Sequence, residues 1–198
     1  MKRWLIVLLI ILGVFLIVGF SLYSTIVGKY NQLVTLSETV DAAWSQVENQ
    51  YQRRADLIPN LVETVKAYAE KEESIFTQIA DARARIGSSQ TRVQREQTES
   101  ELTGFLSRLL MLQENYPQLK SNQNFLDLQA QLEGTENRIS VERQRYIQSI
   151  KDYNMQVKQF PGRLIAGFFG FEARDFYQAT PGAETAPRVD FGGGPPQE

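Results

Sequence analysis

The sequence predicts an all-α protein, in which an N-terminal transmembrane helix is followed by a long antiparallel helical bundle. Two observations predict this class. Residues 4–23 carry no charge and are apolar or aromatic apart from two glycines and one serine. From residue 37 onward, apolar side chains recur at steps of three and four, which is typical of helices that bury one face. No segment shows the alternation of a β-strand or a glycine-rich phosphate loop.

The apolar segment is long enough to cross a bilayer. The stretch from Trp4 to Tyr23 makes about 30 Å of helix, which matches the hydrocarbon core. A cleavable signal peptide would have a shorter apolar region of about 7–15 residues and a small-x-small cleavage site, so we expect residues 1–28 to form a retained anchor. Lys2 and Arg3 precede the span, whereas only Lys29 follows closely. This bias predicts a cytoplasmic N-terminus in the inner membrane and a bundle on the periplasmic side, with the inverted orientation as the alternative.

The bundle is predicted over residues 29–160, from three long helices. Between residues 37 and 86, one series of positions spaced alternately by three and four residues is mostly apolar. We call this series the seam, and it predicts a single helix over the whole stretch. The segment GSSQT (residues 87–91) supplies a helix stop and a new N-cap, which predicts a second helix over about residues 90–114. A third helix is expected over about residues 122–159, after the proline of NYP.

Pro59 lies within the first predicted helix, beside the seam of apolar positions. It predicts either a kink or a restart capped by Asp56, which would split the helix and give a four-helix bundle. Arg54 occupies a seam position, so its guanidinium is expected to reach the edge of the bundle or to pair inside it. Arg53, Arg54, Asp56, Pro59 and Asn60 form a candidate interaction surface; the alternative is a bend stabilised by local charges.

The three predicted helices differ in length, so some turns of the first helix would lack a partner within the chain. We expect these to be the membrane-proximal turns that carry Val40, Trp44, Val47 and Tyr51. An apolar seam left open is usually covered by another copy, another protein or lipid. A homo-oligomer is the first expectation, because a shared anchor raises the effective concentration of the copies.

The C-terminal part is predicted to consist of two segments. Residues 161–179 are apolar and aromatic, and Leu164, Ile165, Phe168, Phe169 and Phe171 are candidate membrane-contact residues. The alternative is that this segment caps the end of the bundle, while Phe160 continues the apolar face of the third helix. Residues 180–198 are rich in proline and glycine and are expected to be disordered.

The amino-acid composition limits the kinds of catalytic, metal-binding and nucleic-acid-binding site that the chain can form. The chain has no histidine and no cysteine, so thiol nucleophiles and the usual ligands of transition metals are missing, and we expect neither an enzyme nor a cofactor. Beyond residue 28, 19 Lys and Arg residues face 23 Asp and Glu residues, a net charge of −4. Without a basic stripe, nucleic acid is not expected as a partner.

Five segments make the chain resemble the LemA family of membrane-anchored bacterial proteins. They are YNQLV (30–34), VDAAWSQVENQYQRRADLIPNLVETVKAYAEKE (40–72), ADARARI (80–86), NYPQLKSNQNFLDLQAQLEGTENRIS (115–140) and YIQSIKDYNMQVKQFP (146–161). The resemblance implies an N-terminal transmembrane helix and an antiparallel helical bundle. It also implies relatives in magnetosome-forming bacteria and a loose association with membrane-bound zinc proteases, and it transfers no catalytic residue.

These expectations lead to two functional hypotheses. The first is a non-enzymatic, membrane-anchored scaffold or adaptor of the cell envelope, which acts through self-association and protein partners. The second is a lipid-binding or membrane-remodelling protein, which would place Trp44, Tyr51 and the aromatic residues of 168–171 against lipid.

Overall fold

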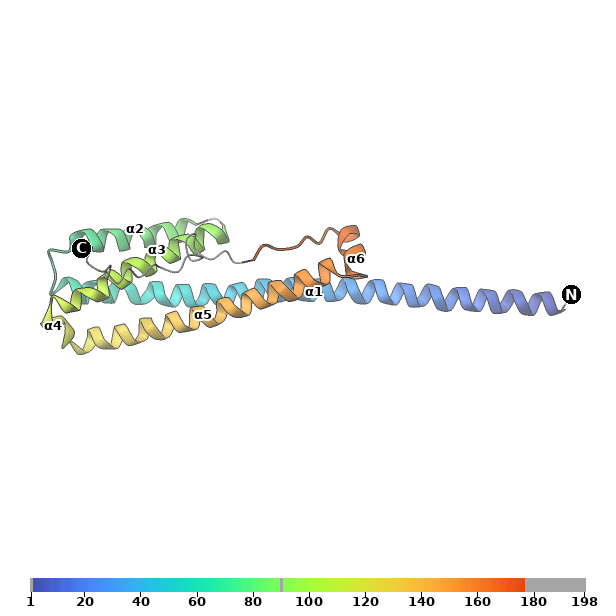
Figure 1. Ribbon diagram of the computed structural model, residues 1–198, viewed down its shortest axis with the longest axis horizontal. Helices are drawn as coiled ribbons and strands as arrows, with labels where there is room; N and C mark the ends of the chain where they lie inside the picture. Colours follow the sequence, from blue (N-terminus) through green and yellow to red (C-terminus); the bar gives the residue numbers. More distant parts are fainter. Residues whose placement is uncertain (1, 90, 177–198) are drawn as a thin grey trace, which may run out of the picture.

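The computed structural model describes residues 2–89 and 91–176, and these residues form helices and connecting turns without a strand. The all-α class is therefore confirmed. Figure 1 shows an elongated molecule, in which one helix extends far beyond the others toward the N-terminus. The predicted Pro/Gly-rich tail, residues 180–198, lies outside the described residues.

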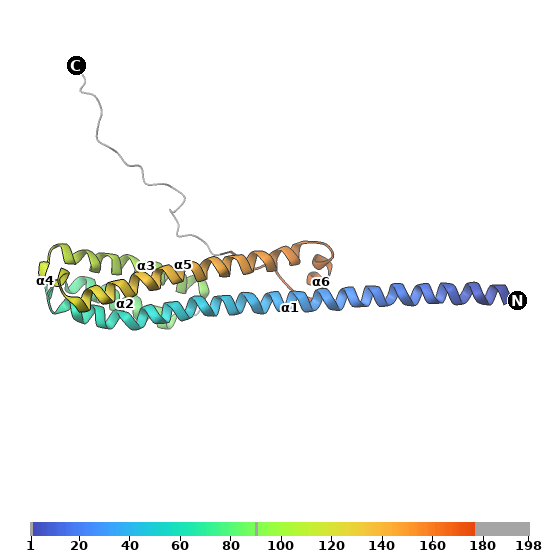
Figure 2. The same ribbon diagram turned by 90° about the horizontal axis from the view of Figure 1, so that it is seen from below.

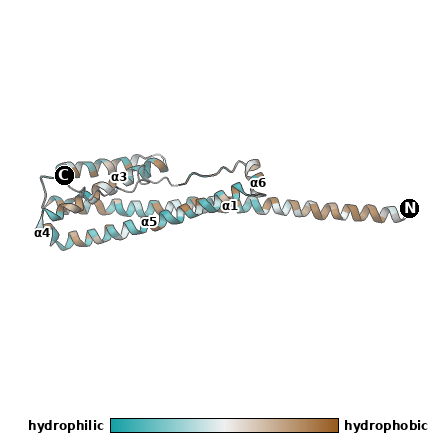
Figure 3. Ribbon diagram, in the orientation of Figure 1, coloured by the Kyte–Doolittle hydropathy of each residue, from teal (hydrophilic) through white to brown (hydrophobic). Residues whose placement is uncertain are grey.

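The helix α1 (Lys2–Lys66) is continuous over 65 residues, a length of about 97 Å. Its first part is the apolar segment, and among the described residues it is the one helix long and apolar enough to cross a membrane. Figure 3 shows this part as the most apolar stretch of the molecule. The helix also continues through Pro59, so of the two alternatives for that residue the split is wrong. Asp56 caps no new helix; its carboxylate accepts a hydrogen bond from Gln52 at 2.9 Å.

The expectation of one helix across residues 37–86 is also wrong, because the chain turns back at residues 67–72. This turn contains neither glycine nor proline. It is held by contacts with residues distant in sequence: the Asn122 amide donates to the Tyr68 hydroxyl at 2.9 Å. Val65 before the turn and Ile79 after it lie in the same core. Folding back therefore lets the parts of the seam on either side of the turn bury their apolar side chains in one core.

The remaining helices agree with the predicted boundaries within a few residues. Thr91 caps the second predicted helix and forms a reciprocal capping box with Gln94, and the side chain of Asn122 caps the third by accepting from the Phe125 N–H. The elements after α1 are α2 (Glu73–Ser88), α3 (Arg92–Met111), the 3-10 helix η1 (Leu112–Glu114), α4 (Pro117–Lys120), α5 (Gln123–Lys158) and α6 (Gly162–Phe169).

Two apolar cores hold the helices together. The distal core joins α1, α2, α3 and α5, and includes Leu61, Ile79, Leu102 and Phe125. The proximal core, nearer the apolar segment, joins α1, α5 and α6. Figures 1 and 2 show α5 running back along α1, with α2 and α3 beside the distal half only. The distal end is therefore four helices thick, and the proximal end is thinner.

Candidate functional site

Arg54, in α1, lies inside the bundle and joins three helices. Its guanidinium pairs with the carboxylate of Glu99 in α3 and with that of Glu136 in α5 at 2.8 Å. It also donates to the Thr103 hydroxyl at 2.8 Å. Only 2% of Arg54 and none of Glu99 is exposed. Because a planar guanidinium addresses several acceptors in fixed directions, Arg54 is suited to hold the facing helices in one register.

Burial dominates the electrostatics of this cluster. It raises the pKa of Glu99 above the ordinary value, while the charge of Arg54 acts in the opposite direction. The Nε atom of Arg54 and the Oε1 atom of Glu99 are buried without a hydrogen-bond partner. The free energy needed to remove both charges from water therefore offsets much of the free energy gained from their attraction. The cluster is a structural cross-link in which each charge depends on the other.

The candidate interaction surface around Pro59 is divided by this arrangement. Arg53, Asp56 and Asn60 are exposed and Pro59 is half-buried, whereas Arg54 is an interior residue. The assignment of Arg54 to a surface is therefore wrong, because its seam position faces α3 and α5. The seam position of Arg54 is compatible with a pair inside the bundle, but it does not identify Glu99 and Glu136 as the partners.

Glu99 was missed, although a signal for it exists in the sequence. It lies three residues before Leu102, on the stripe that faces the core, so a charge at that position needs a buried partner. Glu136 carries no comparable signal, because its side chain remains 44% exposed. Only the packing of α5 against α1 brings it to Arg54.

The predicted self-association seam is covered within the chain. The exposed fractions of Val40, Trp44, Val47 and Tyr51 are 0%, 4%, 0% and 1%. Residues of α5, including Tyr146, pack over them in the proximal core, and the rings of Trp44 and Tyr146 are 5.2 Å apart. The expectation of an open seam is therefore wrong, and so is the hypothesis that Trp44 and Tyr51 touch lipid. The cause is the turn at residues 67–72, which ends α1 at Lys66, so that the 36 residues of α5 reach back to this level.

A second polar cluster fastens the segment after α6 to α1. The Arg174 guanidinium binds both carboxylate oxygens of Asp41, at 2.7 and 2.8 Å, and Arg92 binds Asp41 at 2.7 Å. The bonds from Arg174, which have the largest effect, and from Arg92 lower the pKa of Asp41 to about 2. Partial burial of the carboxylate acts in the opposite direction. Asp41, Arg92 and Arg174 line a hollow of about 460 Å³, and Glu96 lies in its wall as well. Burial raises the pKa of Glu96 to about 7.

The predicted membrane-contact residues divide into an outer and an inner set. Leu164 and Phe168 are 66% and 84% exposed, and Phe169 is 46% exposed. Ile165 is only 7% exposed, and Phe171 packs against the proximal core. Ile165 and Phe171 are therefore bundle residues, so α6 also caps the bundle, as the alternative predicts. Phe160, expected on the buried face of the third helix, is 81% exposed.

Aromatic contacts connect α6 to α1 just beyond the apolar segment. The ring of Tyr30 lies 4.8 Å from that of Phe169 and 5.8 Å from that of Phe171. Phe168 in turn lies 5.1 Å from Phe169. Figure 2 shows α6 at the end of the bundle from which the N-terminal part of α1 extends.

Comparison with known proteins gives a family and a set of relatives. The model of the LemA family matches residues 43–191. Magnetosome protein MamQ 2 and magnetosome protein MamQ 1 of Paramagnetospirillum magneticum are each 27% identical, over 89% of this chain and 74% of theirs. Magnetosome protein MamQ of Magnetospirillum gryphiswaldense is 26% identical, over 82% of this chain and 69% of its own.

Proposed function

Because this chain belongs to the LemA family, we propose that it is a membrane-anchored, non-enzymatic helical scaffold of the bacterial cell envelope. The continuity of α1 carries the proposal. The same helix contributes the apolar span and the core residues of both halves of the bundle. A bundle built on such a helix would keep a fixed orientation to its anchor, which is what a scaffold needs.

We place the anchor in the inner membrane with its N-terminus in the cytoplasm. Lys2 and Arg3 precede the span, which supports this orientation through the positive-inside rule. The bundle then lies on the periplasmic side. Relatives that carry the name magnetosome protein support a role at a membrane.

Two observations support a non-enzymatic role. The sequence lacks histidine and cysteine, which supply most acid–base and nucleophilic catalysts. Within the described part of the chain, the buried carboxylate of Glu99 is engaged by Arg54, so it is not poised toward a substrate.

The partner surface proposed for this scaffold is the exposed polar strip of α1 that carries Arg53, Asp56 and Asn60. These side chains point away from the core, and the neighbouring Arg54 cluster fixes the helix beneath them. The proposed partner is a protein of the envelope, such as a membrane-bound protease.

Photo-cross-linking in native membranes tests this function. A photoreactive amino acid at Asp56 or Asn60 is expected to capture the same protein, and the product should disappear when Arg53→Glu is added. The same probe at Glu114, an exposed position in η1, serves as the control. Products of equal yield at all three positions, or none at any, would contradict the proposal. A product with twice the mass of the chain would identify the partner as a second copy.

A further inference from the structure

We propose that α6 and the turn before it form a second membrane contact, which rests on the anionic surface of the bilayer that α1 enters. The inference rests on the proposed membrane anchorage. It assigns the lipid surface as the partner of a face that the bundle leaves uncovered.

The apolar composition of this face is the first observation. Leu164 and Phe168 lie four residues apart and therefore on one side of α6. Phe160 precedes them in the turn by the same interval. Their exposed fractions are 66%, 84% and 81%, so the residues that the structure describes leave most of each side chain uncovered. The opposite side of α6 packs into the proximal core through Ile165 and Ala166, so α6 is apolar on two sides and the bundle covers only one of them. The other side can enter a membrane interface.

The position of α6 is the second observation. Tyr30, which contacts Phe169, lies seven residues after Tyr23, the end of the apolar segment, or about 10 Å along the helix. Headgroup regions add roughly 5–8 Å on each side of the hydrocarbon core. The aromatic contacts from Tyr30 through Phe169 to Phe168 therefore begin at the level where the chain leaves the lipid headgroups.

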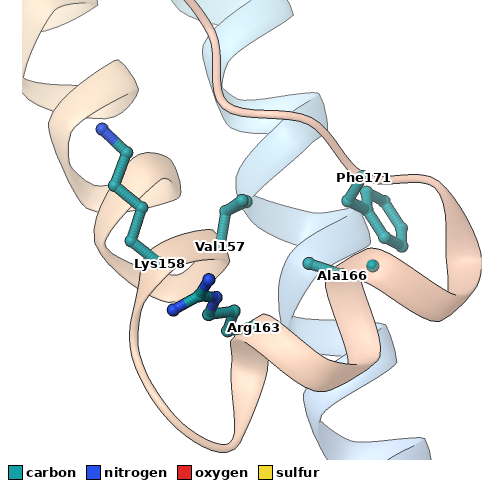
Figure 4. A pocket seen from close by; sticks show the side chains of 6 residues that line it. Val157, Lys158, Arg163, Ala166 and Phe171 are labelled. Carbon is teal, nitrogen blue, oxygen red and sulfur yellow. The ribbon is translucent and has the colours of Figure 1, made fainter.

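Basic side chains on either side of the turn before α6 are the third observation. Lys158 and Arg163 line a hollow of about 410 Å³, whose wall also includes Ala166 and Phe171. Figure 4 shows the two basic side chains on the same side of this hollow, with Phe171 across from them. Lys158 and Arg163 are exposed, and neither has a carboxylate partner among the residues that the structure describes. Cations beside an apolar face attract anionic headgroups while the face enters the interface.

These observations favour a bilayer over a second copy of the chain. The anchor holds the exposed face beside a membrane in every molecule, whereas a second copy would have to supply a matching acidic surface at the same height. The acidic residues nearest in sequence, Glu172 and Asp175, belong to the segment that Arg174 ties back against α1. They lie on the far side of Gly170, where the chain leaves α6 through a left-handed conformation.

The test uses the full-length chain in lipid vesicles. Because the chain lacks cysteine, single-cysteine variants can carry one environment-sensitive fluorophore each. Labels at Leu164→Cys and Phe168→Cys are expected to be quenched by lipids that carry a nitroxide at the headgroup. The label at Val141→Cys, an exposed apolar position on α5, is expected to remain unquenched. A label at Phe15→Cys lies near the middle of the apolar segment, so it reports the anchorage through quenching by lipids that carry the nitroxide on the acyl chain.

The pattern of quenching separates the two proposals. Quenching at Phe15 without quenching at Leu164 and Phe168 refutes the second contact and leaves the anchorage intact. No quenching at any of the three positions refutes both. A blue-shifted but unquenched label at Phe168 would mean that protein, not lipid, covers the face, and this would also overturn the inference.

A charge variant tests the choice of lipid. Quenching at Phe168 is expected to be stronger in vesicles that contain anionic lipid than in purely zwitterionic ones. Lys158→Gln with Arg163→Gln should abolish this increase. Lys71→Gln with Lys120→Gln, which removes the same charge from exposed positions at the distal end, should retain it. Equal increases in both double variants would refute the role of the basic pair.

Discussion

The guanidinium of Arg174 binds the carboxylate of Asp41 through both terminal nitrogens, at 2.7 and 2.8 Å, although the two residues are 133 positions apart in the sequence. Arg174 is further tied to α5, because its backbone N–H donates to the Asn154 side chain at 2.8 Å and its carbonyl oxygen accepts from the same side chain at 2.7 Å. One residue thus joins the end of the described chain to α1 and α5. Beyond Phe171, which packs against the proximal core, polar bonds fix the segment that follows α6 to the bundle.

Replacement of Arg174 by glutamine is expected to release this segment with little effect on the rest of the fold. The ion pair with Asp41 is partly exposed, at 27% and 41% of the two side chains, so its loss should cost about 1 kcal/mol or less of unfolding free energy. Hydrogen exchange at the Arg174 amide should nevertheless accelerate strongly. The control is Arg145→Gln, which removes an exposed pair with Glu142 and should leave that exchange unchanged.

The free energy of unfolding should depend on pH through Glu96. Burial raises the pKa of this carboxyl from 4.5 to about 7 in the folded chain, so the folded state keeps a proton that the unfolded state loses earlier. This contribution to stability is complete below pH 4.5 and is lost as the pH rises through about 7. Glu96→Gln should remove that decline, and above about pH 7 it should be more stable than the parent. Denaturant titrations across this range check the sign.

The acid limb of the same profile should come from Asp41 and have the opposite sign. The pKa of Asp41 is lowered from 3.8 to about 2, so its contribution is present above pH 3.8 and is lost as the pH falls through about 2. Asp41→Asn should flatten the limb, while Glu96→Gln should not affect it. An unchanged limb in Asp41→Asn would contradict the assignment.

Arg54→Ala should destabilise the bundle by about 3–5 kcal/mol, because it leaves the buried carboxylate of Glu99 without its partner. Glu70→Ala, at an exposed position, should stay within about 0.5 kcal/mol of the parent. Adding Glu99→Leu to Arg54→Met should restore most of the loss, since the unpaired charge is removed. A double variant no more stable than Arg54→Ala would show that the cluster acts through something other than charge pairing.

Gly162→Ala should displace α6, whereas Gly167→Ala should not. A Cβ atom at Gly162 would clash with the backbone oxygen of Gln156, while one at Gly167 would meet open space. The first substitution forces a backbone shift, with an expected cost of roughly 1–3 kcal/mol. Thermal unfolding and hydrogen exchange of α6 measure it, and equal behaviour of the two variants would contradict the close approach.

Much of the fold could be predicted because its signals are local. The apolar segment, the Thr91 and Asn122 caps and the period of the helix seams each depend on a few neighbouring residues. The turn at residues 67–72 has no such signal, since the bond between Asn122 and Tyr68 that helps hold it joins distant residues. The seam also keeps its phase across this turn, which made two helices resemble one.

The candidate site was predicted less completely, because its residues meet through packing. The position of Arg54 on the seam indicated a buried charge, but Glu136 reaches it only because α5 returns at that level. Similarly, an apolar composition identified residues 161–179 without separating Ile165, which faces the core, from Phe168, which does not. That division depends on how α6 docks, and docking is a property of the whole bundle.

Because α1 is continuous, a tilt of its apolar segment would also tilt the part of the helix that lies in the bundle. Membrane-spanning helices lean by about 20° on average, and they lean further where the bilayer is thinner than their apolar length. From Gly28 to Lys66 the helix extends roughly 57 Å, so such a lean would carry its far end about 20 Å sideways. In a bilayer, the thickness of the lipid would thus set where the distal end of the bundle stands above the membrane plane.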